Sequence, residues 1–136
     1  MYKISYLIAL YNKEEFVVDT ISSILKEESE LFTIEICIVN DGSTDKSLKV
    51  INQYFGKNQK VIIDSLEDNK GKNAAYNKAY KNSSGDYICV FGVDDLVEKG
   101  RAETLLNKSI ETDKTVYGGL TAFDNNTSKF HHDIYY

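Results

Sequence analysis

Two different spacings of apolar residues alternate along the chain. Short, nearly continuous apolar runs such as TIEICIV at residues 33–39 are typical of buried strands. Each run is followed by apolar residues spaced three or four positions apart, as at Val17, Ile21 and Ile24, which is typical of one face of a helix. We therefore expect strands and helices in turn. The strands are predicted at residues 3–10, 33–39, 60–64, 86–93 and 115–123, and the helices at 17–25, 48–54, 73–82 and 98–110.

This alternation predicts βαβ units, whose strands lie parallel and whose helices cover both faces of the sheet. Burial on both faces accounts for the unbroken apolar character of residues 33–39 and 86–93. The fold class is thus expected to be α/β, with a Rossmann-like, doubly wound, mostly parallel sheet. No repeat or low-complexity linker interrupts the pattern, so residues 1–136 are expected to form a single domain. Gly85 is expected to cap the end of the third helix.

Composition and charge exclude several classes of protein. A formal net charge of -5 and a pI near 5.0 leave no basic surface of the kind that nucleic-acid binders use. No apolar run approaches the roughly 20 residues of a membrane span, and the N-terminal stretch lacks a signal-peptide cleavage pattern. A cytoplasmic protein is expected. Cys37 and Cys89 lie in apolar runs, where buried, unreactive thiols are expected rather than a disulfide or a metal site.

Polar residues follow the predicted strands at the points where ligands bind. Ligands of open α/β sheets lie beyond the carboxyl ends of the strands, so the loops ALYNKEE, NDGSTD, LEDNKGK and VDDLVEK are the candidate site. The loops ALYNKEE, NDGSTD and VDDLVEK each bring an acid or an amide at the strand exit, and the loop LEDNKGK brings lysines. These residues are Asn12, Asn40, Asp41, Asp94, Asp95, Lys70 and Lys72.

This mixture of groups suits a nucleotide. An aspartate accepts hydrogen bonds from a base or from ribose hydroxyls, and a tyrosine such as Tyr11 stacks on a base. Paired carboxylates hold a divalent cation that bridges phosphates. Purely structural interpretations stand beside this one: Asp41 would form a turn whose Ser43 or Thr44 caps the second helix, and Asp94 with Asp95 would only begin the fourth helix.

Three segments carry a resemblance to a known family. Taken in order, ALYNKEEFVVDTISSIL, EICIVNDGSTDKSL and DNKGKNAAYNKAYKNSSGDYICVFGVDD resemble the nucleotide-binding half of a family 2 glycosyltransferase with the GT-A fold. The resemblance covers residues 3 to about 95 without a gap. It implies transfer of a sugar from a nucleotide diphosphate donor, most often a UDP-sugar, to an acceptor hydroxyl, with inversion favoured.

The resemblance also implies a nucleotide site. Tyr11 would lie against the base, Asp41 would hydrogen-bond the uracil ring, and Lys70 or Lys72 would lie nearby. Ala9 belongs to the same site, at a position where the family commonly has proline or threonine.

A metal site is implied at the acidic pair. Asp95 would ligate Mn²⁺ or Mg²⁺ directly, and Asp94 would reach the ribose or the metal shell. The cation would act as a Lewis acid that stabilises the leaving nucleotide diphosphate. The family often has a further acid where this chain has Gly92, so a thinner metal shell is expected.

The resemblance places the acceptor site and the catalytic base beyond the donor motifs. The base is expected outside this chain, which would then be truncated on its acceptor side. The segment NNTSKFHHDIYY is expected to be a polar loop followed by a partly ordered end. The expected partners are a nucleotide-sugar donor and a saccharide or lipid-linked acceptor, with peripheral membrane association through a missing region. The weaker candidates for a base or a ligand are Asp124, His131, His132 and Asp133.

Other functions remain open. The main alternative is a module that binds a nucleotide sugar without turnover. A receiver-like signalling domain would need an acceptor aspartate after the third strand and a lysine after the fifth. It is disfavoured because the third strand here ends with Ile63-Asp64-Ser65. A nucleotidyltransferase is disfavoured because the loop ALYNKEE is not rich in glycine and arginine.

Overall fold

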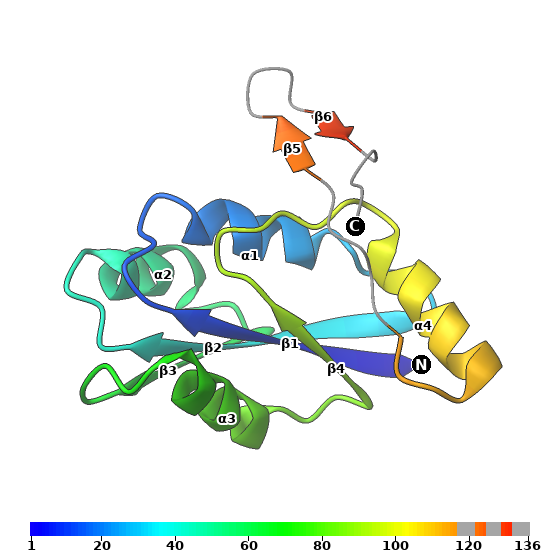
Figure 1. The fold of residues 1–136 in the computed structure, drawn as a ribbon, viewed down its shortest axis with the longest axis horizontal. Helices are drawn as coiled ribbons and strands as arrows, with labels where there is room; N and C mark the ends of the chain where they lie inside the picture. The colour runs from blue at the N-terminus through cyan, green and yellow to red at the C-terminus, as the bar shows by residue number, and fades with distance from the viewer. Residues whose placement is uncertain (117–121, 125–128, 132–136) are drawn as a thin grey trace.

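The fold is a four-stranded parallel sheet with helices on both faces (Figure 1). A computed structural model describes residues 1–116, 122–124 and 129–131. The strands of the sheet are β1 (Tyr2–Leu10), β2 (Phe32–Asp41), β3 (Val61–Leu66) and β4 (Tyr87–Phe91). The helices are α1 (Val17–Leu25), α2 (Ser47–Phe55), α3 (Lys72–Asn82) and α4 (Arg101–Thr112).

The strand order is β3-β2-β1-β4, with all neighbours parallel. The register places Ile8 of β1 beside both Ile38 of β2 and Phe91 of β4. All four carboxyl ends therefore lie along one edge of the sheet. The predicted α/β, doubly wound, parallel fold is confirmed.

Two apolar clusters hold the layers together. On one face, Ile8 and Ile36 of the sheet pack with Ile21 of α1, Ile51 of α2 and Leu106 of α4. On the other face, α3 packs on the sheet through small side chains. That cluster consists of Leu7, Cys37, Val39, Ala75 and Ala79. Alanines allow α3 to approach the sheet closely, which explains how a helix of low overall hydrophobicity is held in place.

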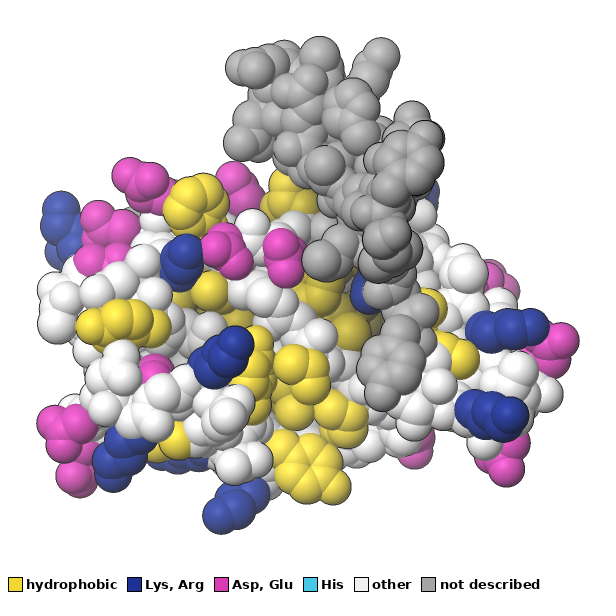
Figure 2. Space-filling model, in the orientation of Figure 1, with side chains coloured by type: hydrophobic (Ala, Val, Ile, Leu, Met, Phe, Trp, Pro, Cys, Tyr) yellow, Lys and Arg dark blue, Asp and Glu magenta, His cyan; other side chains and the backbone are white. Residues whose placement is uncertain are grey.

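The prediction that residues 86–93 are buried on both faces is wrong for one face of β4. Ile88 is exposed and Val90 is 61% exposed, and Figure 2 shows hydrophobic side chains at the surface over this strand. The physical reason is position: β4 ends the strand order, and α3 packs on β1, β2 and β3. The prediction holds for β2, an inner strand that is buried almost throughout.

The prediction that Gly85 caps α3 is wrong. The helix ends at Asn82, and Ser83 follows in an extended conformation. The Gly85 amide instead donates to Ser5 Oγ at 2.8 Å, and a Cβ at this position would collide with Ser5. Glycine is needed here because the chain passes close to β1.

The two helix-start interpretations of the acidic loops are also wrong, for the cap of α2 and for the start of α4. α2 begins at Ser47 without a cap from Ser43 or Thr44, because those side chains contact Asn12 instead. α4 begins at Arg101, well beyond Asp95. Its first turn is held by the buried Glu27, which accepts from the amides of Gly100 at 2.8 Å and Ala102 at 2.9 Å.

The end of the chain contains two short antiparallel strands, β5 (Ala122–Asp124) and β6 (Lys129–His131). β5 overlaps the predicted strand at 115–123, of which residues 117–121 lie outside the described residues. The prediction of a polar loop in NNTSKFHHDIYY is wrong at residues 129–131, which form β6 and pair with β5. His132 and Asp133 lie outside the described residues.

Two further expectations concern membranes and thiols. None of the helices described is long and apolar enough to cross a membrane. Cys37 and Cys89 are both free thiols, and the predicted burial holds for Cys37 but is wrong for Cys89. Cys37 is buried, and burial raises the pKa of its thiol to about 12. Cys89 is only half-buried.

Candidate functional site

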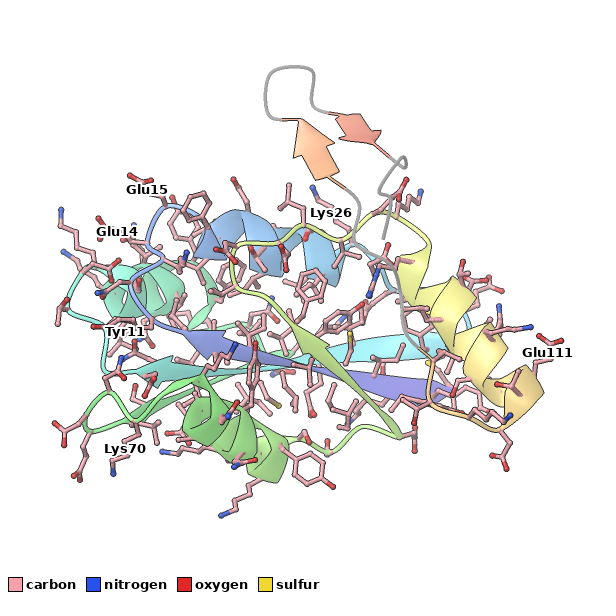
Figure 3. The ribbon with its side chains drawn as sticks, in the orientation of Figure 1. Tyr11, Glu14, Glu15, Lys26, Lys70 and Glu111 are labelled. Atoms are coloured by element: carbon pink, nitrogen blue, oxygen red, sulfur yellow. The ribbon has the colours of Figure 1, made fainter. Side chains whose placement is uncertain are left out.

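The carboxyl ends of the strands bring four loops to one end of the molecule. Figure 3 places Tyr11, Glu14 and Lys70 at this end and Glu111 at the opposite one. The prediction that the four loops meet at one edge of the sheet is therefore confirmed.

Asn12 joins the first two loops. Its backbone is in the left-handed region with φ 49°, which asparagine tolerates better than most residues. Its Oδ1 accepts from the backbone amides of Thr44 at 2.8 Å and Asp45 at 3.2 Å. The backbone amide of Asn12 donates to Ser43 Oγ at 3.1 Å. Asn12 thus holds the site together and has its side-chain oxygen already occupied.

Asp41 is held between the second and third loops. It is only 2% exposed, and its Oδ1 accepts from the Lys70 amide at 2.7 Å. Gly42 has φ +66°, and a Cβ there would lie 2.6 Å from the Asn69 amide nitrogen. The tight passage at Gly42 lets the third loop close over Asp41.

A pocket of about 260 Å³ opens beside Asp41. Predicted nucleotide-binding residues form most of its wall, and Tyr11 is 43% exposed there. Lys70 contributes its amide to Asp41 rather than a side chain to the wall. The lining residues are Ala9, Leu10, Tyr11, Asp41, Asn69, Gly71 and Lys72. The pocket combines an aromatic face, a buried carboxylate and a lysine.

The acidic pair lies on a loop that is anchored on both sides to α1. Thr20 Oγ1 donates to the Val93 carbonyl at 2.8 Å, and the Val97 amide donates to Ser23 Oγ at 3.1 Å. These anchors fix the backbone on either side of the pair.

Gly92 makes room for Asp95. A Cβ at Gly92 would collide with the Asp95 carboxylate, so a larger residue at this position would push that carboxylate away. Tyr76 packs beside the loop, and its hydroxyl donates to the Phe91 carbonyl at 3.3 Å. Burial, and then the negative charges of Asp95 and Asp94, raise the pKa of Tyr76.

The acidic pair suits a cation that brings other ligands with it. Among the residues that the structure describes, no group of three or more His, Cys, Asp or Glu side chains could enclose a metal ion. The chain offers two adjacent carboxylates, Asp94 and Asp95. Mg²⁺ is characteristically held by one or two carboxylates together with water and substrate phosphates. The donor set therefore fits a cation shared with a diphosphate.

Sequence reasoning missed Lys13 in this site. Lys13 Nζ donates to Asp94 Oδ2 at 2.7 Å and lies 5.6 Å from the centroid of the Phe16 ring. It also missed Asn69 and Gly71, which line the pocket. No local pattern distinguishes these residues, because their roles depend on which loops the sheet places side by side.

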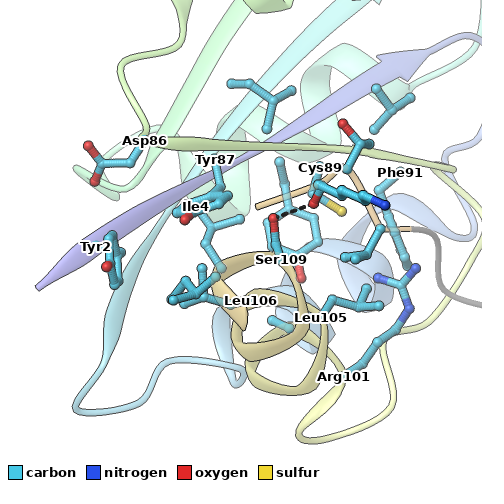
Figure 4. Close-up of a pocket in the computed structure, with 18 of the residues that line it drawn as sticks. Tyr2, Ile4, Asp86, Tyr87, Cys89, Phe91, Arg101, Leu105, Leu106 and Ser109 are labelled. Carbon is cyan, nitrogen blue, oxygen red and sulfur yellow. Dashed lines mark hydrogen bonds between the residues drawn. The ribbon is translucent and has the colours of Figure 1, made fainter. Parts of the chain in front are cut away.

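A larger cavity of about 990 Å³ lies between β4 and α4 (Figure 4). Tyr6, Phe91 and Leu105 line it, and Asp95 reaches its wall. Arg101 also borders the cavity, with its guanidinium 5.8 Å from the Phe91 ring centroid. Within the part of the chain that the structure describes, its buried Nη1 has no hydrogen-bond partner. The cavity and the acidic pair are thus adjacent.

Comparison with known proteins identifies relatives of this chain. Residues 5–135 match glycosyl transferase family 2. An uncharacterized glycosyltransferase of Haemophilus influenzae is 32% identical over 120 residues, covering 88% of this chain and 47% of that protein. Poly-beta-1,6-N-acetyl-D-glucosamine synthase of Staphylococcus aureus is 35% identical over 96 residues, covering 71% of this chain and 23% of that protein.

A solved structure with the same fold is that of S. aureus TarS 1-349 in complex with UDP. It matches with a TM-score of 0.70 and 25% identity, over 80% of this chain and 32% of that one. The chain spans less than half the length of these relatives. The match over nearly all of its residues and the parallel sheet lead to one conclusion: the chain belongs to glycosyl transferase family 2.

Proposed function

We propose that this chain binds the donor in a glycosyltransferase that moves a sugar from a nucleoside diphosphate, a UDP-sugar, to an acceptor hydroxyl. The observation that carries the proposal is the pocket at the carboxyl ends of β1 and β2, lined by Tyr11, Asp41 and Lys72. The UDP complex of the structurally similar TarS supports the choice of UDP.

The pocket offers a stacking face and a hydrogen-bond acceptor that suit a uracil ring. The ring of Tyr11 is exposed enough to stack on the base. Asp41 uses Oδ1 for the Lys70 amide, which leaves Oδ2 to accept a proton donor such as the N3–H of uracil. Ala9 lines the wall without filling it. Lys72, at the first position of α3, brings a positive charge to the same wall.

Asp94 and Asp95 would hold the divalent cation, Mn²⁺ or Mg²⁺. When bound, the cation supplies Lewis-acid stabilisation of the negative charge on the leaving diphosphate. Thr20 and Ser23 keep the acidic loop in place through Val93 and Val97. The backbone that carries the two carboxylates is therefore fixed before the ligand arrives, which lowers the cost of ordering the loop.

Inverting transfer also requires a general base within hydrogen-bond reach of the acceptor hydroxyl. We place this base and the acceptor site outside the donor pocket. Asp41 is committed to the pocket, and Asp94 and Asp95 are committed to the cation. The alternative function, donor binding without transfer by this chain, follows if the base lies outside residues 1–136.

The proposal is tested in two steps. Calorimetry with UDP, GDP and CDP, each with Mn²⁺ and with EDTA, measures base choice and metal use. Incubation with a panel of UDP-sugars and acceptors then measures UDP release above the control without acceptor. We expect binding of UDP in preference to GDP and CDP. Acceptor-dependent release identifies a complete transferase, whereas binding without release identifies a donor-binding part. Absence of UDP binding in Mn²⁺ contradicts the proposal.

A further inference from the structure

Lys13 reaches across the site to the acidic pair. It follows β1, whereas Asp94 follows β4, and 81 residues separate them. The Lys13 Nζ to Asp94 Oδ2 distance is 2.7 Å. This ion pair occupies one of the two carboxylates that the proposed function gives to a divalent cation.

The backbone on both sides of the ion pair is fixed independently of it. The Lys13 amide donates to the Oγ of the buried Ser47 at 2.9 Å, and the Lys13 carbonyl accepts from the Val17 amide at 3.1 Å. Asp94 lies between the two anchors of its loop to α1. Only the side chains need to move if the pair breaks.

The ion pair is also easily exchanged. The Lys13 side chain is 36% exposed and the Asp94 side chain 45% exposed, so water screens their attraction. Exposed pairs of this kind contribute little to stability. The pair is therefore not needed to join the first and fourth loops. A lysine side chain is long and flexible enough to take a new partner nearby.

We propose that Lys13 is an exchangeable counter-ion: it neutralises Asp94 in the free protein and passes to the donor diphosphate when a divalent cation takes the acidic pair. This inference rests on the proposed function. In the free protein, Asp94, Asp95 and Lys13 together carry a net negative charge. A divalent cation makes the same three groups net positive, and the released ammonium then faces an anion.

The exchange predicts effects of opposite sign on two ligands. Without Lys13, a cation by itself binds more tightly, because no ammonium competes for Asp94. Without Lys13, UDP in the presence of the cation binds more weakly, because the diphosphate loses a charged donor. Uridine, which has no phosphate, binds equally well with or without Lys13. An ion pair with only a structural role predicts no loss that is specific to the diphosphate.

The test compares the wild-type chain with Lys13→Met, Lys13→Arg and Lys108→Met. Lys108 forms an exposed pair with Glu111 at 2.9 Å on α4, so its variant controls for the loss of one charge and one surface pair. Mn²⁺ binding is followed by electron paramagnetic resonance. Uridine binding, and UDP binding in Mn²⁺, are followed by calorimetry.

For Lys13→Met, we expect Mn²⁺ alone to bind about two- to fivefold more tightly and UDP in Mn²⁺ about tenfold more weakly. Uridine binding should be unchanged, Lys13→Arg should retain UDP affinity, and Lys108→Met should behave as wild type. If Lys13→Met retains wild-type affinity for UDP, or loses uridine and UDP affinity equally, this inference is overturned and the proposed function stands. A wild-type chain that binds no UDP contradicts both.

Discussion

In the proposed function, Asp41 would combine two tasks in one buried carboxylate. One oxygen accepts from the Lys70 amide at 2.7 Å, which fixes the third loop, and the other would accept from the ligand. Replacement by alanine would remove both functions and leave a backbone amide without its partner. A change that separates the two tasks is more informative.

We expect Asp41→Asn to weaken UDP binding by about 1 to 3 kcal/mol. The amide oxygen of asparagine still accepts from the Lys70 backbone, but its NH₂ group cannot accept from uracil N3–H. Calorimetry measures the affinity, and thermal unfolding checks that stability is retained. Asp68→Asn is the control, because Asp68 is an exposed carboxylate on the same loop. Wild-type UDP affinity in Asp41→Asn would rule out a bond from this carboxylate to the base.

Alanine substitutions at two glycines near the pocket distinguish the effect of backbone strain from that of steric contact. Gly42 and Gly71 both have positive φ, at +66° and +88°, where alanine costs about 1 to 2 kcal/mol. Only at Gly42 would a Cβ also press on the backbone, 2.6 Å from the Asn69 nitrogen. We expect Gly42→Ala to destabilise the protein more than Gly71→Ala and to weaken UDP binding, as measured by denaturant unfolding and calorimetry. Equal losses of stability in the two variants would show that the third loop can move away from a Cβ at position 42 at little cost.

At the scale of elements, buried or half-buried carboxylates tie together segments that are distant in the chain. Glu35 of β2 accepts from Ser5 Oγ of β1 at 2.7 Å. It also accepts from the amide and the hydroxyl of Ser84, just before β4, each at 2.8 Å. Burial alone would raise the pKa of Glu35, but these hydrogen bonds and the charge of Lys3 together lower it below its ordinary value of 4.5.

The lowered pKa predicts a pH-dependent contribution to stability. A carboxyl whose pKa is depressed in the folded state stabilises the fold above its unfolded pKa, and this stabilisation is lost as pH falls through the folded value. We expect Glu35→Gln to be less stable than wild type above about pH 4.5, with the difference shrinking in more acidic solution. Denaturant unfolding across this range measures it, with the exposed Glu30→Gln as control. A difference that is independent of pH would contradict the assignment.

At the scale of the whole molecule, the sheet places the pocket beside Asp41 and the acidic pair at the ends of neighbouring strands. β1, which leads to Tyr11, lies between β2, which ends at Asp41, and β4, which leads to Asp94. A ligand with a base at one end and a diphosphate at the other would span these strands. The parallel arrangement is what allows one molecule to contact all four loops.

This arrangement predicts that UDP binding depends on a divalent cation. We expect UDP to bind more weakly in EDTA than in Mn²⁺, and Asp95→Asn to reduce the affinity in Mn²⁺ by about tenfold, because an amide lacks the charge that holds the cation. Calorimetry measures both, and Asp19→Asn, an exposed carboxylate on α1, serves as control. Equal affinity in EDTA and Mn²⁺ would refute the role of the acidic pair.

Local pattern was enough to predict the elements and the edge of the sheet that carries the site. Apolar periodicity is set by which side chains must leave water, so the strands and helices of residues 2–112 follow from it. The same reasoning brought the loops of Tyr11, Asp41 and Lys72 to one place, the resemblance added Ala9, and these four residues line one pocket. The carboxyl ends of parallel strands meet wherever the sheet forms, so this convergence needed no knowledge of side-chain positions.

The tertiary structure alone decided how polar groups pair. Asn12 was placed among the candidate loops without a role, and it joins two of those loops. Gly85 was predicted as a helix cap and instead allows a close approach to Ser5. Lys13 pairs with Asp94 although 81 residues separate them. A hydrogen bond or an ion pair requires two groups at about 3 Å, and that distance is set by strand order and loop packing, which a single sequence does not contain as a local signal.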